Sequence, residues 1–336
     1  MIQQSIDLSE YTTFGVNAIA SEFARFDSVE RLSTIINSFP NRSLLVLGGG
    51  SNLLATKDID ALVLKNEIKG ITITEETDNH VIVECGAGEV WHEFVMFCVN
   101  NGWGGIENLS LIPGSVGASP MQNIGAYGVE IKDVFHSLDA FCIADGSVKT
   151  FSKEACEFGY RESVFKRKLK DQYIILTVRF TLTKHPEVNT KYGAIETQIN
   201  EMGITSPTIK DVSDAVIAIR SSKLPDPAVL GNAGSFFKNP VVSEEIALSI
   251  LNQYPDAPVY DTAEKNQKKL AAGWLIEKAG WKGKRIGNCG VHEKQALVLV
   301  NFGGATGKEI FELSQRILDD VKQMFGVSLE REVNIL

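Results

Sequence analysis

Short apolar runs bounded by polar residues or glycine mark the first part of the chain. Residues 44–47, 61–64 and 81–83 are three such runs, and their length and boundaries are typical of buried β-strands. Between residues 89 and 100 the apolar positions recur on one helical face, and Gly102 is suited to end that helix. Strands and helices are therefore expected to alternate in this region.

The pattern changes after Gly102. Residues 102–128 are rich in glycine, contain two prolines and follow neither a helical nor a strand period. Residues 134–143 and 173–183 are then expected as strands, and the second alternates clearly between apolar and polar positions. Because strands and helices no longer alternate regularly, the sequence predicts an α+β fold.

The last third follows a turn-rich bridge at residues 224–227, Leu-Pro-Asp-Pro, which is typical of a domain boundary. A helix is expected just before this bridge, at residues 209–220. Thr306 and Glu309 form a capping box that opens a long amphipathic helix, and Gly326 is suited to end it. The remaining expected elements are helices at 246–251 and 271–279 and strands at 296–300 and 327–333.

Composition narrows the class of protein. The chain has 336 residues, of which 44% are hydrophobic and 22% charged, and this is typical of a soluble globular protein with two or three domains. A net charge of −9 disfavours nucleic acid as a partner. No apolar run approaches the roughly 20 residues of a membrane span, and the first residues show no secretory signal. We therefore expect a cytoplasmic protein without a membrane partner.

Cysteines and histidines give no sign of a metal site or of disulfides. The five cysteines are odd in number and form no Cys-x-x-Cys pair, which indicates reduced core thiols. The five histidines include no pair at i, i+4 spacing, so no metal is expected.

Two glycine-rich segments are candidates for binding a phosphorylated ligand. Residues 48–52, Gly-Gly-Gly-Ser-Asn, directly follow a predicted strand, so that their N–H groups can face a pyrophosphate; taken alone, they fit a tight surface turn better. Residues 112–128 are too apolar for a disordered loop, and their length favours a segment packed around an extended ligand. An Ω-loop packed on itself is the alternative. The sequence contains no Walker A loop and no Gly-x-Gly-x-x-Gly motif in a strand–helix context.

A third segment, residues 231–240, combines small residues with two aromatic ones. It brings together a hydroxyl, an ammonium and an amide, on Ser235, Lys238 and Asn239. Taken alone, a serine in such a segment is more often a turn or cap residue than a catalytic one.

Five segments together carry a resemblance. They are GGGSN at 48–52, IPGSVGASPMQNIGAYG at 112–128, FGYRES at 158–163, RSSKLPDP at 220–227 and GNAGSFFKNP at 231–240. In this order they resemble the UDP-N-acetylenolpyruvoylglucosamine reductase family of peptidoglycan synthesis. The resemblance runs from about Thr13 to Val333, and the segment around Tyr192 is similar to one branch of that family.

The resemblance implies an α+β fold of the vanillyl-alcohol-oxidase (PCMH) type. FAD would be held by two subdomains, residues 1–67 and 68–224, and a substrate-binding domain would span 225–325. A C-terminal strand at 326–336 would return to the second subdomain. We expect a monomer.

The implied reaction is a hydride relay. NADPH reduces FAD, which then reduces the enolpyruvyl group of the UDP-sugar to give UDP-N-acetylmuramate, while the protein supplies orientation, charge and a proton. Neither glycine-rich segment contains His or Cys, so we expect non-covalent FAD.

Residue roles follow from the same matching. Ser235 corresponds to the family's proton donor, Arg161 to the arginine that holds the developing carboxylate charge, and Glu332 to the C-terminal glutamate of the active site. A guanidinium fork suits a bidentate grip on a carboxylate. Outside the family context, Glu332 is better explained as a solvated strand residue. The matched substrate-binding positions are Tyr192, Lys223, Asn239 and Gln295. The matched cofactor-binding positions are Gly48, Gly49, Gly50, Ser51, Asn52, Ile112, Pro113, Gly114, Gly117, Ala118, Ser119, Gln122, Asn123, Gly125, Ala126, Tyr127, Gly128, Arg220 and Leu224.

Two positions depart from the common pattern of the family. Ser115 stands where many members have Cys, a small-for-small change that should be tolerated. Asn334 stands where many members have Arg, so no guanidinium is available for a flavin contact there.

Two other functions stay open. A flavin oxidase of the same superfamily, with oxygen as acceptor, would need neither residues 234–237 nor Glu332. A nucleotide-binding module without chemistry would not need Arg161, Ser235 and Glu332 together.

Overall fold

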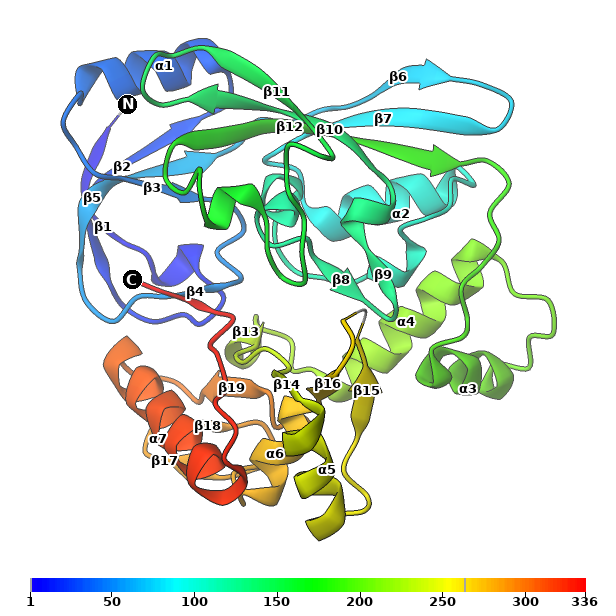
Figure 1. Cartoon of the computed structure of the whole chain (residues 1–336). Helices are drawn as coiled ribbons and strands as arrows, with labels where there is room; N and C mark the ends of the chain where they lie inside the picture. The colour runs from blue at the N-terminus through cyan, green and yellow to red at the C-terminus, as the bar shows by residue number, and fades with distance from the viewer. Residues whose placement is uncertain (1, 263) are drawn as a thin grey trace. The chain divides into compact units, whose positions relative to one another are not determined.

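Figure 1 shows the computed structural model of the chain, which describes residues 2–262 and 264–336. The chain forms two compact units, and each is considered by itself. Unit 1 comprises Met1–Ile6, Ala20–Gly49 and Asp60–Ser222, and unit 2 comprises Asp7–Ile19, Gly50–Ile59 and Lys223–Leu336. The predicted domain bounds, with two subdomains at 1–67 and 68–224 and a substrate-binding domain at 225–325, remain a prediction.

The first sheet lies almost wholly in unit 1. Its strands, in spatial order, are β1 (Gln3–Asp7), β2 (Ile19–Phe26), β5 (Ile59–Asn66) and β3 (Leu44–Leu47). β3 and β5 run parallel, with Leu47 opposite Lys65. The helix α1 (Val29–Ser38) begins after Ser28, whose hydroxyl accepts a hydrogen bond from the N–H of Arg31, and its apolar face packs into the core of this sheet.

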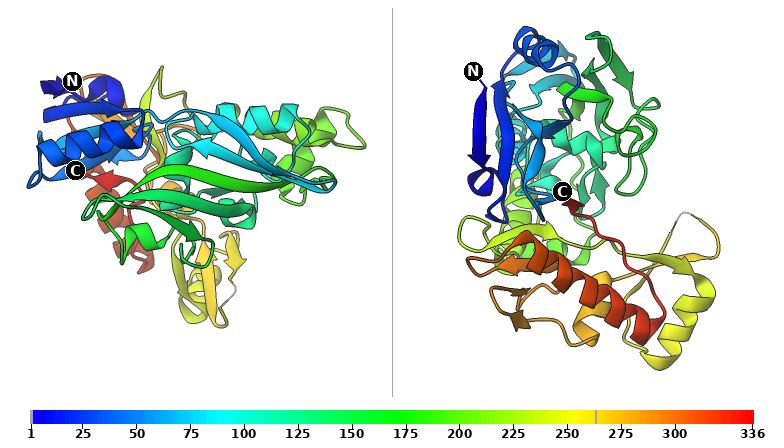
Figure 2. Two further views of the ribbon diagram at one scale, coloured as in Figure 1. Left: turned by 90° about the horizontal axis from the view of Figure 1, so that it is seen from above. Right: turned by 90° about the vertical axis from the view of Figure 1, so that its left-hand side faces the viewer.

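The second sheet of unit 1 is antiparallel in all its recorded pairings and appears in Figure 2 as the long cyan and green strands. In spatial order its strands are β11 (Val148–Ser152), β10 (Phe135–Cys142), β12 (Tyr173–Thr183), β7 (His80–Gly86) and β6 (Ile71–Glu76). Helix α2 (Trp91–Asn100) covers this sheet, because Trp91 and Phe94 pack against Phe180 with ring centroids 5.8 and 5.1 Å away.

Smaller elements complete unit 1. Helices α3 (Gly193–Glu201) and α4 (Ile209–Lys223) share a buried apolar cluster, against which Tyr127 packs. A short hairpin, β8 (Gly125–Ala126) and β9 (Val129–Glu130), lies at the end of the second glycine-rich segment. Unit 1 also forms 3-10 helices at Glu107–Leu109, Val116–Met121, Ile131–Asp133 and Val164–Lys166, and a further one at Ser9–Tyr11 belongs to unit 2.

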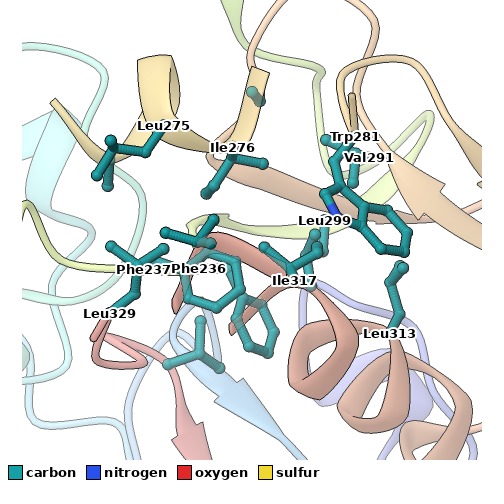
Figure 3. Close-up of a cluster of buried hydrophobic side chains, with 14 of the residues drawn as sticks. Phe236, Phe237, Leu275, Ile276, Trp281, Val291, Leu299, Leu313, Ile317 and Leu329 are labelled. Atoms are coloured by element: carbon teal, nitrogen blue, oxygen red, sulfur yellow. The ribbon is translucent and has the colours of Figure 1, made fainter. Parts of the chain in front are cut away.

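Unit 2 holds a four-stranded and a three-stranded sheet, a two-stranded pairing described below, and a helical layer around one apolar core. One sheet has the order β13 (Gly231–Ser235), β19 (Val298–Asn301), β18 (Cys289–Val291) and β17 (Arg285–Ile286); the other has β14 (Val241–Ser243), β16 (Gln267–Leu270) and β15 (Val259–Asp261). The helices are α5 (Glu244–Gln253), α6 (Ala272–Lys278) and α7 (Gly307–Phe325). Figure 3 shows the core, in which Phe236 and Phe237 pack among residues of α6, α7 and β19.

Most expected elements are found, some of them residue for residue. The strands at 44–47 and 173–183 have the predicted bounds. The capping box of α7 is present, and Gly326 ends that helix with a left-handed backbone, φ 70°. All five cysteines are free and buried, as predicted. Among the described residues, no helix is long and apolar enough to cross a lipid bilayer.

One expected strand was wrong. Residues 327–333 form no continuous strand; they make a single antiparallel bridge, between Arg331 and Phe237. After this bridge the chain changes partner, and β20 (Asn334–Ile335) pairs in parallel with β4 (Leu53–Leu54). An alternating sequence indicates that a segment is extended, but it does not tell whether the segment pairs with a single neighbouring strand along its whole length.

Candidate functional site

The two glycine-rich segments meet within unit 1. A Cβ atom on Gly49 would lie 2.7 Å from the Cα atom of Gly114, and a Cβ atom on Gly48 would collide with the hydroxyl of Ser115. The Ser115 hydroxyl can rotate away from position 48, but the atoms next to Gly49 are backbone, so packing between the two segments requires glycine at position 49. The backbone of residues 48–49 therefore lies directly against the start of the second segment.

The second segment is held by its own hydrogen bonds to the protein. The N–H groups of Val116 and Gly117 donate to the carbonyls of Glu89 and Ala87. Asn123 is fully buried: its amide donates to the carboxylate of Glu130 at 2.9 Å and to a backbone carbonyl, and its oxygen accepts from a backbone N–H. These bonds give the segment a fixed shape, and its predicted contact with FAD remains a prediction.

Leu111, just before the second segment, has a left-handed backbone conformation, φ 57°. Its N–H donates to Nδ1 of His92 at 3.0 Å, and its carbonyl accepts a 3.2 Å bond from Nε of Arg220. Burial lowers the pKa of His92, and the positive charge of Arg220 lowers it further, against the opposing effect of Glu93. Burial also lowers the pKa of Arg220, which the neighbouring Tyr127 hydroxyl opposes. Neutral His92 and charged Arg220 thus hold an unfavourable backbone in place.

Lys65 is a second cation beside the glycine-rich segments. It lies at the carboxyl end of β5, opposite Leu47, and its ammonium donates to the carbonyl of Gly48. Burial lowers its pKa, which the negative charge of Glu67 opposes. The crevice beyond the carboxyl ends of parallel strands is where open sheets commonly bind ligands. Sequence reasoning missed both His92 and Lys65, although Lys65 interrupts an apolar run just where the strand ends.

Arg161 is brought to the same segment by a tight turn. Gly159 and Glu162 form an isolated bridge, and Arg161 between them has φ 55°. Its guanidinium donates to the carbonyl of Gly125 at 2.6 Å and lies over the ring of Tyr160. The predicted carboxylate-holding arginine therefore lies at the far end of the second glycine-rich segment.

Ser235 is presented by an irregular strand end in unit 2. The register of β13 against β19 shifts between Asn232 and Ser235, and Gly234 has φ 66°. Asn232 fixes this bulge, because its side-chain oxygen accepts from the N–H of Gly234 at 2.9 Å while its amide donates to the carbonyls of Pro225 and Leu230. A bulge re-aims the side chain that follows it, and Ser235 is that side chain.

Glu332 lies on the neighbouring backbone of the same unit. Its N–H donates to the carbonyl of Phe236 at 2.8 Å, and the N–H of Lys238 donates to the carbonyl of Glu330 at 2.9 Å. We call these two backbone hydrogen bonds the backbone ladder. Because Phe236 is fully buried, its side of the ladder is held in place by the core. Two predicted catalytic residues, far apart in sequence, thus lie on adjacent backbones.

Known protein families match both the N-terminal and the C-terminal part of the chain. The family described as FAD binding domain matches residues 20–152, and the family described as UDP-N-acetylenolpyruvoylglucosamine reductase, C-terminal domain, matches residues 226–336. Proteins named UDP-N-acetylenolpyruvoylglucosamine reductase from Flavobacterium johnsoniae and Amoebophilus asiaticus are 51% and 50% identical to it, over 100% of this chain and 99% of each relative. The chain belongs to the UDP-N-acetylenolpyruvoylglucosamine reductase family.

The fold agrees with this membership. The crystal structure of UDP-N-acetylenolpyruvylglucosamine reductase from Thermus caldophilus is 24% identical and superposes with a TM-score of 0.71, covering 100% of this chain and 98% of that chain. The chain is thus an FAD-containing oxidoreductase with the predicted α+β, PCMH-type fold.

The predicted substrate-binding residues of this reductase family member divide between the units. Tyr192 lies in unit 1, half-exposed, with its ring edge-on to Tyr127 at 5.4 Å. Lys223, Asn239 and Gln295 lie in unit 2. The oxygen of Asn239 accepts from the N–H of Ala272 at the start of α6, and the oxygen of Gln295 accepts a long 3.4 Å bond from the N–H of Leu297. In Asn239 and in Gln295, the side-chain oxygen faces a backbone N–H group. The side-chain NH₂ group of each residue therefore points away from that N–H group.

The remaining predicted cofactor residues divide in the same manner. Ser119 is buried and donates to the carbonyl of Val116 at 2.7 Å. Asn52 donates to the carbonyl of Glu332 within unit 2. Unit 1 contains Gly48, Gly49, Ile112, Pro113, Gly114, Gly117, Ala118, Ser119, Gln122, Asn123, Gly125, Ala126, Tyr127, Gly128 and Arg220, and unit 2 contains Gly50, Ser51, Asn52 and Leu224.

Proposed function

We propose that the chain catalyses the NADPH-dependent reduction of UDP-N-acetylenolpyruvoylglucosamine to UDP-N-acetylmuramate in peptidoglycan biosynthesis, with non-covalent FAD as hydride carrier. Relatives that match over the full length carry the name of this reductase. The structural observation that carries the proposal is the backbone ladder that joins Phe236, next to Ser235, to Glu332.

The residues around Gly48 fit an anionic cofactor. The ammonium of Lys65 lies against the Gly48 carbonyl, and Arg220 fixes the start of the second segment. The buried hydroxyl of Ser115, which faces Gly48, has no hydrogen-bond partner among the residues that the structure describes. A cation and a buried donor beside glycine backbone suit a pyrophosphate. We propose that these residues, with the predicted cofactor positions, hold FAD.

When held by these residues, FAD would supply the hydride chemistry, from NADPH to the methylene carbon of the enolpyruvyl group. Ser235 then gives a proton to the neighbouring carbon, so that one hydride and one proton saturate the double bond. Arg161 holds the substrate carboxylate, on which negative charge develops. A serine hydroxyl is a poor acid and needs cationic or hydrogen-bonding neighbours, a role that we assign to Lys223 and Asn239.

We assign the remaining substrate contacts to the UDP moiety. Tyr192 is a half-exposed phenol that can lie over the diphosphate, and the NH₂ group of Gln295 is a donor for a phosphate oxygen. Glu332 serves the proton-transfer step beside Ser235. The proposal includes a monomeric enzyme that acts in the cytoplasm, and size-exclusion chromatography of the holoenzyme tests the monomer.

Anaerobic titration tests the proposal as a whole. NADPH added to the yellow holoenzyme should bleach the flavin absorbance, and the enolpyruvyl UDP-sugar should restore it. Steady turnover with oxygen and a hydroxy acid, without NADPH, would favour an oxidase instead. A colourless protein that binds the UDP-sugar would favour a binding module.

A further inference from the structure

Asn52 closes the first glycine-rich segment and also touches the C-terminal backbone. Its side-chain amide donates to the carbonyl of Glu332 at 3.2 Å. Its own carbonyl accepts two bonds from Asn334, one from the backbone N–H and one from the side-chain amide, both 3.1 Å long. Asn52 is therefore hydrogen-bonded to the C-terminal segment in both directions: it donates to the carbonyl of Glu332 and accepts from Asn334. We call this arrangement the clamp on Glu332.

The backbone of Glu332 is held on both sides. Its N–H is bonded to the carbonyl of Phe236, and its carbonyl is bonded to the amide of Asn52. Phe236 is itself anchored, because its N–H donates to the carbonyl of Leu297 at 2.8 Å. Within unit 2, the Glu332 backbone is thus hydrogen-bonded on one side to the residue that follows Ser235 and on the other side to Asn52.

The preceding residue fixes the direction of the Glu332 side chain. The guanidinium of Arg331 is bonded to the side chains of Ser314 and Gln315 on α7, and it lies 4.4 Å from the centroid of the Phe311 ring. Successive side chains of an extended segment point to opposite sides. Because the Arg331 side chain is bonded to α7, this alternation predicts that the Glu332 side chain points away from that helix, while Asn52 holds the Glu332 carbonyl.

We propose that Asn52 is a positioning residue for Glu332, acting through the hydrogen bond from its side-chain amide to the Glu332 carbonyl. Asn334 in turn holds Asn52 in place, because the side-chain amide of Asn334 donates a hydrogen bond to the carbonyl of Asn52. The inference rests on the proposed function, in which Glu332 acts in the second half-reaction. It makes Asn52 part of the support of the proton-transfer residues, in addition to its predicted contact with FAD.

The test separates the two half-reactions by stopped flow, with FAD-saturated protein. Asn52→Asp keeps the shape of the side chain but replaces the donor by an acceptor, and Asn52→Ala removes the contact without adding charge. In both variants, measured at saturating FAD, reoxidation by the enolpyruvyl UDP-sugar should slow about 10- to 100-fold more than reduction by NADPH does, because the lost bond misplaces a group that acts only in the second step. A role in overall stability alone would slow both steps together.

A double-variant comparison ties the effect to Glu332. Glu332→Gln should slow reoxidation, and adding Asn52→Ala to it should slow the step no further, because two residues that act as one unit are not additive. The control is Asn288→Ala, which removes another side-chain amide bonded to a backbone carbonyl, that of Gly304, and should leave both steps unchanged.

Three outcomes overturn the inference. Wild-type reoxidation in both Asn52 variants removes Asn52 from the step, and multiplication of the two effects in the double variant shows that Asn52 acts independently of Glu332. Either result leaves the proposed function intact. Wild-type reoxidation in Glu332→Gln instead refutes the role of Glu332, and the inference falls with it.

Discussion

The N–H of Glu332 donates a 2.8 Å hydrogen bond to the carbonyl oxygen of Phe236, the residue that follows Ser235. The bond belongs to a single antiparallel bridge, between Phe237 and Arg331. Because Phe236 and Phe237 are buried in the core of unit 2, the bridge has little freedom to move. It brings together two residues that we assign to the second half-reaction.

Ser235→Ala should separate the two half-reactions. Reduction of the flavin by NADPH needs no acid at the substrate carbon and should be nearly unchanged. Reoxidation by the UDP-sugar should slow by roughly 10²–10⁴-fold, the usual contribution of a positioned acid. Ser235→Cys should retain part of the rate through its thiol. Stopped-flow absorbance of the flavin measures both steps, and undiminished reoxidation in the Ala variant would exclude Ser235 as the donor.

Lys65→Met should weaken FAD binding. The substitution keeps the length of the side chain and removes both the charge and the bond to the Gly48 carbonyl. A hydrogen bond from a charged group contributes about 1.5–3 kcal/mol, so losing the contact that we propose between the Lys65 ammonium and the FAD pyrophosphate should raise the dissociation constant of FAD at least about tenfold. Flavin fluorescence during dilution measures it. Lys69→Met, which removes an exposed ion pair with Glu89, is the matched control, and equal effects in both variants would contradict a specific role for Lys65.

FAD retention should fall in mild acid through His92. Only the neutral ring accepts the N–H of Leu111, and burial and Arg220 hold the pKa of His92 below its usual range. The stabilisation is therefore complete above about pH 6.5, the pKa of an unfolded histidine, and it is lost as the pH falls through the lower folded-state value. Released FAD at pH 5–8 measures this.

The matched variants for this profile are His92→Gln and His136→Gln. A glutamine oxygen can accept the Leu111 N–H at every pH, so His92→Gln should flatten the profile. His136 is an exposed histidine elsewhere, and His136→Gln should keep the wild-type profile. An unchanged acid response in His92→Gln, with circular dichroism showing intact folding, would refute the assignment.

Gly49→Ala should destabilise the protein even without FAD. The new methyl group would lie 2.7 Å from Gly114, and overpacking of this kind costs about 1–3 kcal/mol. Thermal unfolding of FAD-free protein should therefore shift to lower temperature. Gly193→Ala meets no atom within 4 Å and should leave the transition unchanged; a wild-type transition in Gly49→Ala would show that the two segments do not pack closely in the cofactor-free state.

The cysteines should be unreactive in the native protein. All five are buried, and burial raises the pKa of Cys156 to about 12 and those of Cys85 and Cys98 higher still. Because the thiolate is the reactive form, Ellman's reagent at pH 8 should label no thiol in the native state and five in denaturant. Rapid labelling of the folded protein would indicate an opening that exposes the core.

The sequence alone determined the α+β class, the long strand at 173–183, the capped helix α7 and the set of candidate residues. These features are local: period, capping and turn residues act within a few positions, and motifs carry their spacing with them. The resemblance of the five segments then pointed to one reductase family, which the comparisons confirmed.

Only the tertiary structure decided which distant residues meet. The requirement for glycine at position 49 comes from Gly114, the support of Leu111 from His92 and Arg220, and the clamp on Glu332 from Asn52. The spacing of apolar and polar residues within one segment does not predict such contacts, because they depend on how separate strands and loops pack together. For the same reason the sequence predicted one strand at 327–333, whereas the chain there pairs first with Phe237 and then with β4. Extended conformation is a local property, and the choice of partner is made by the fold.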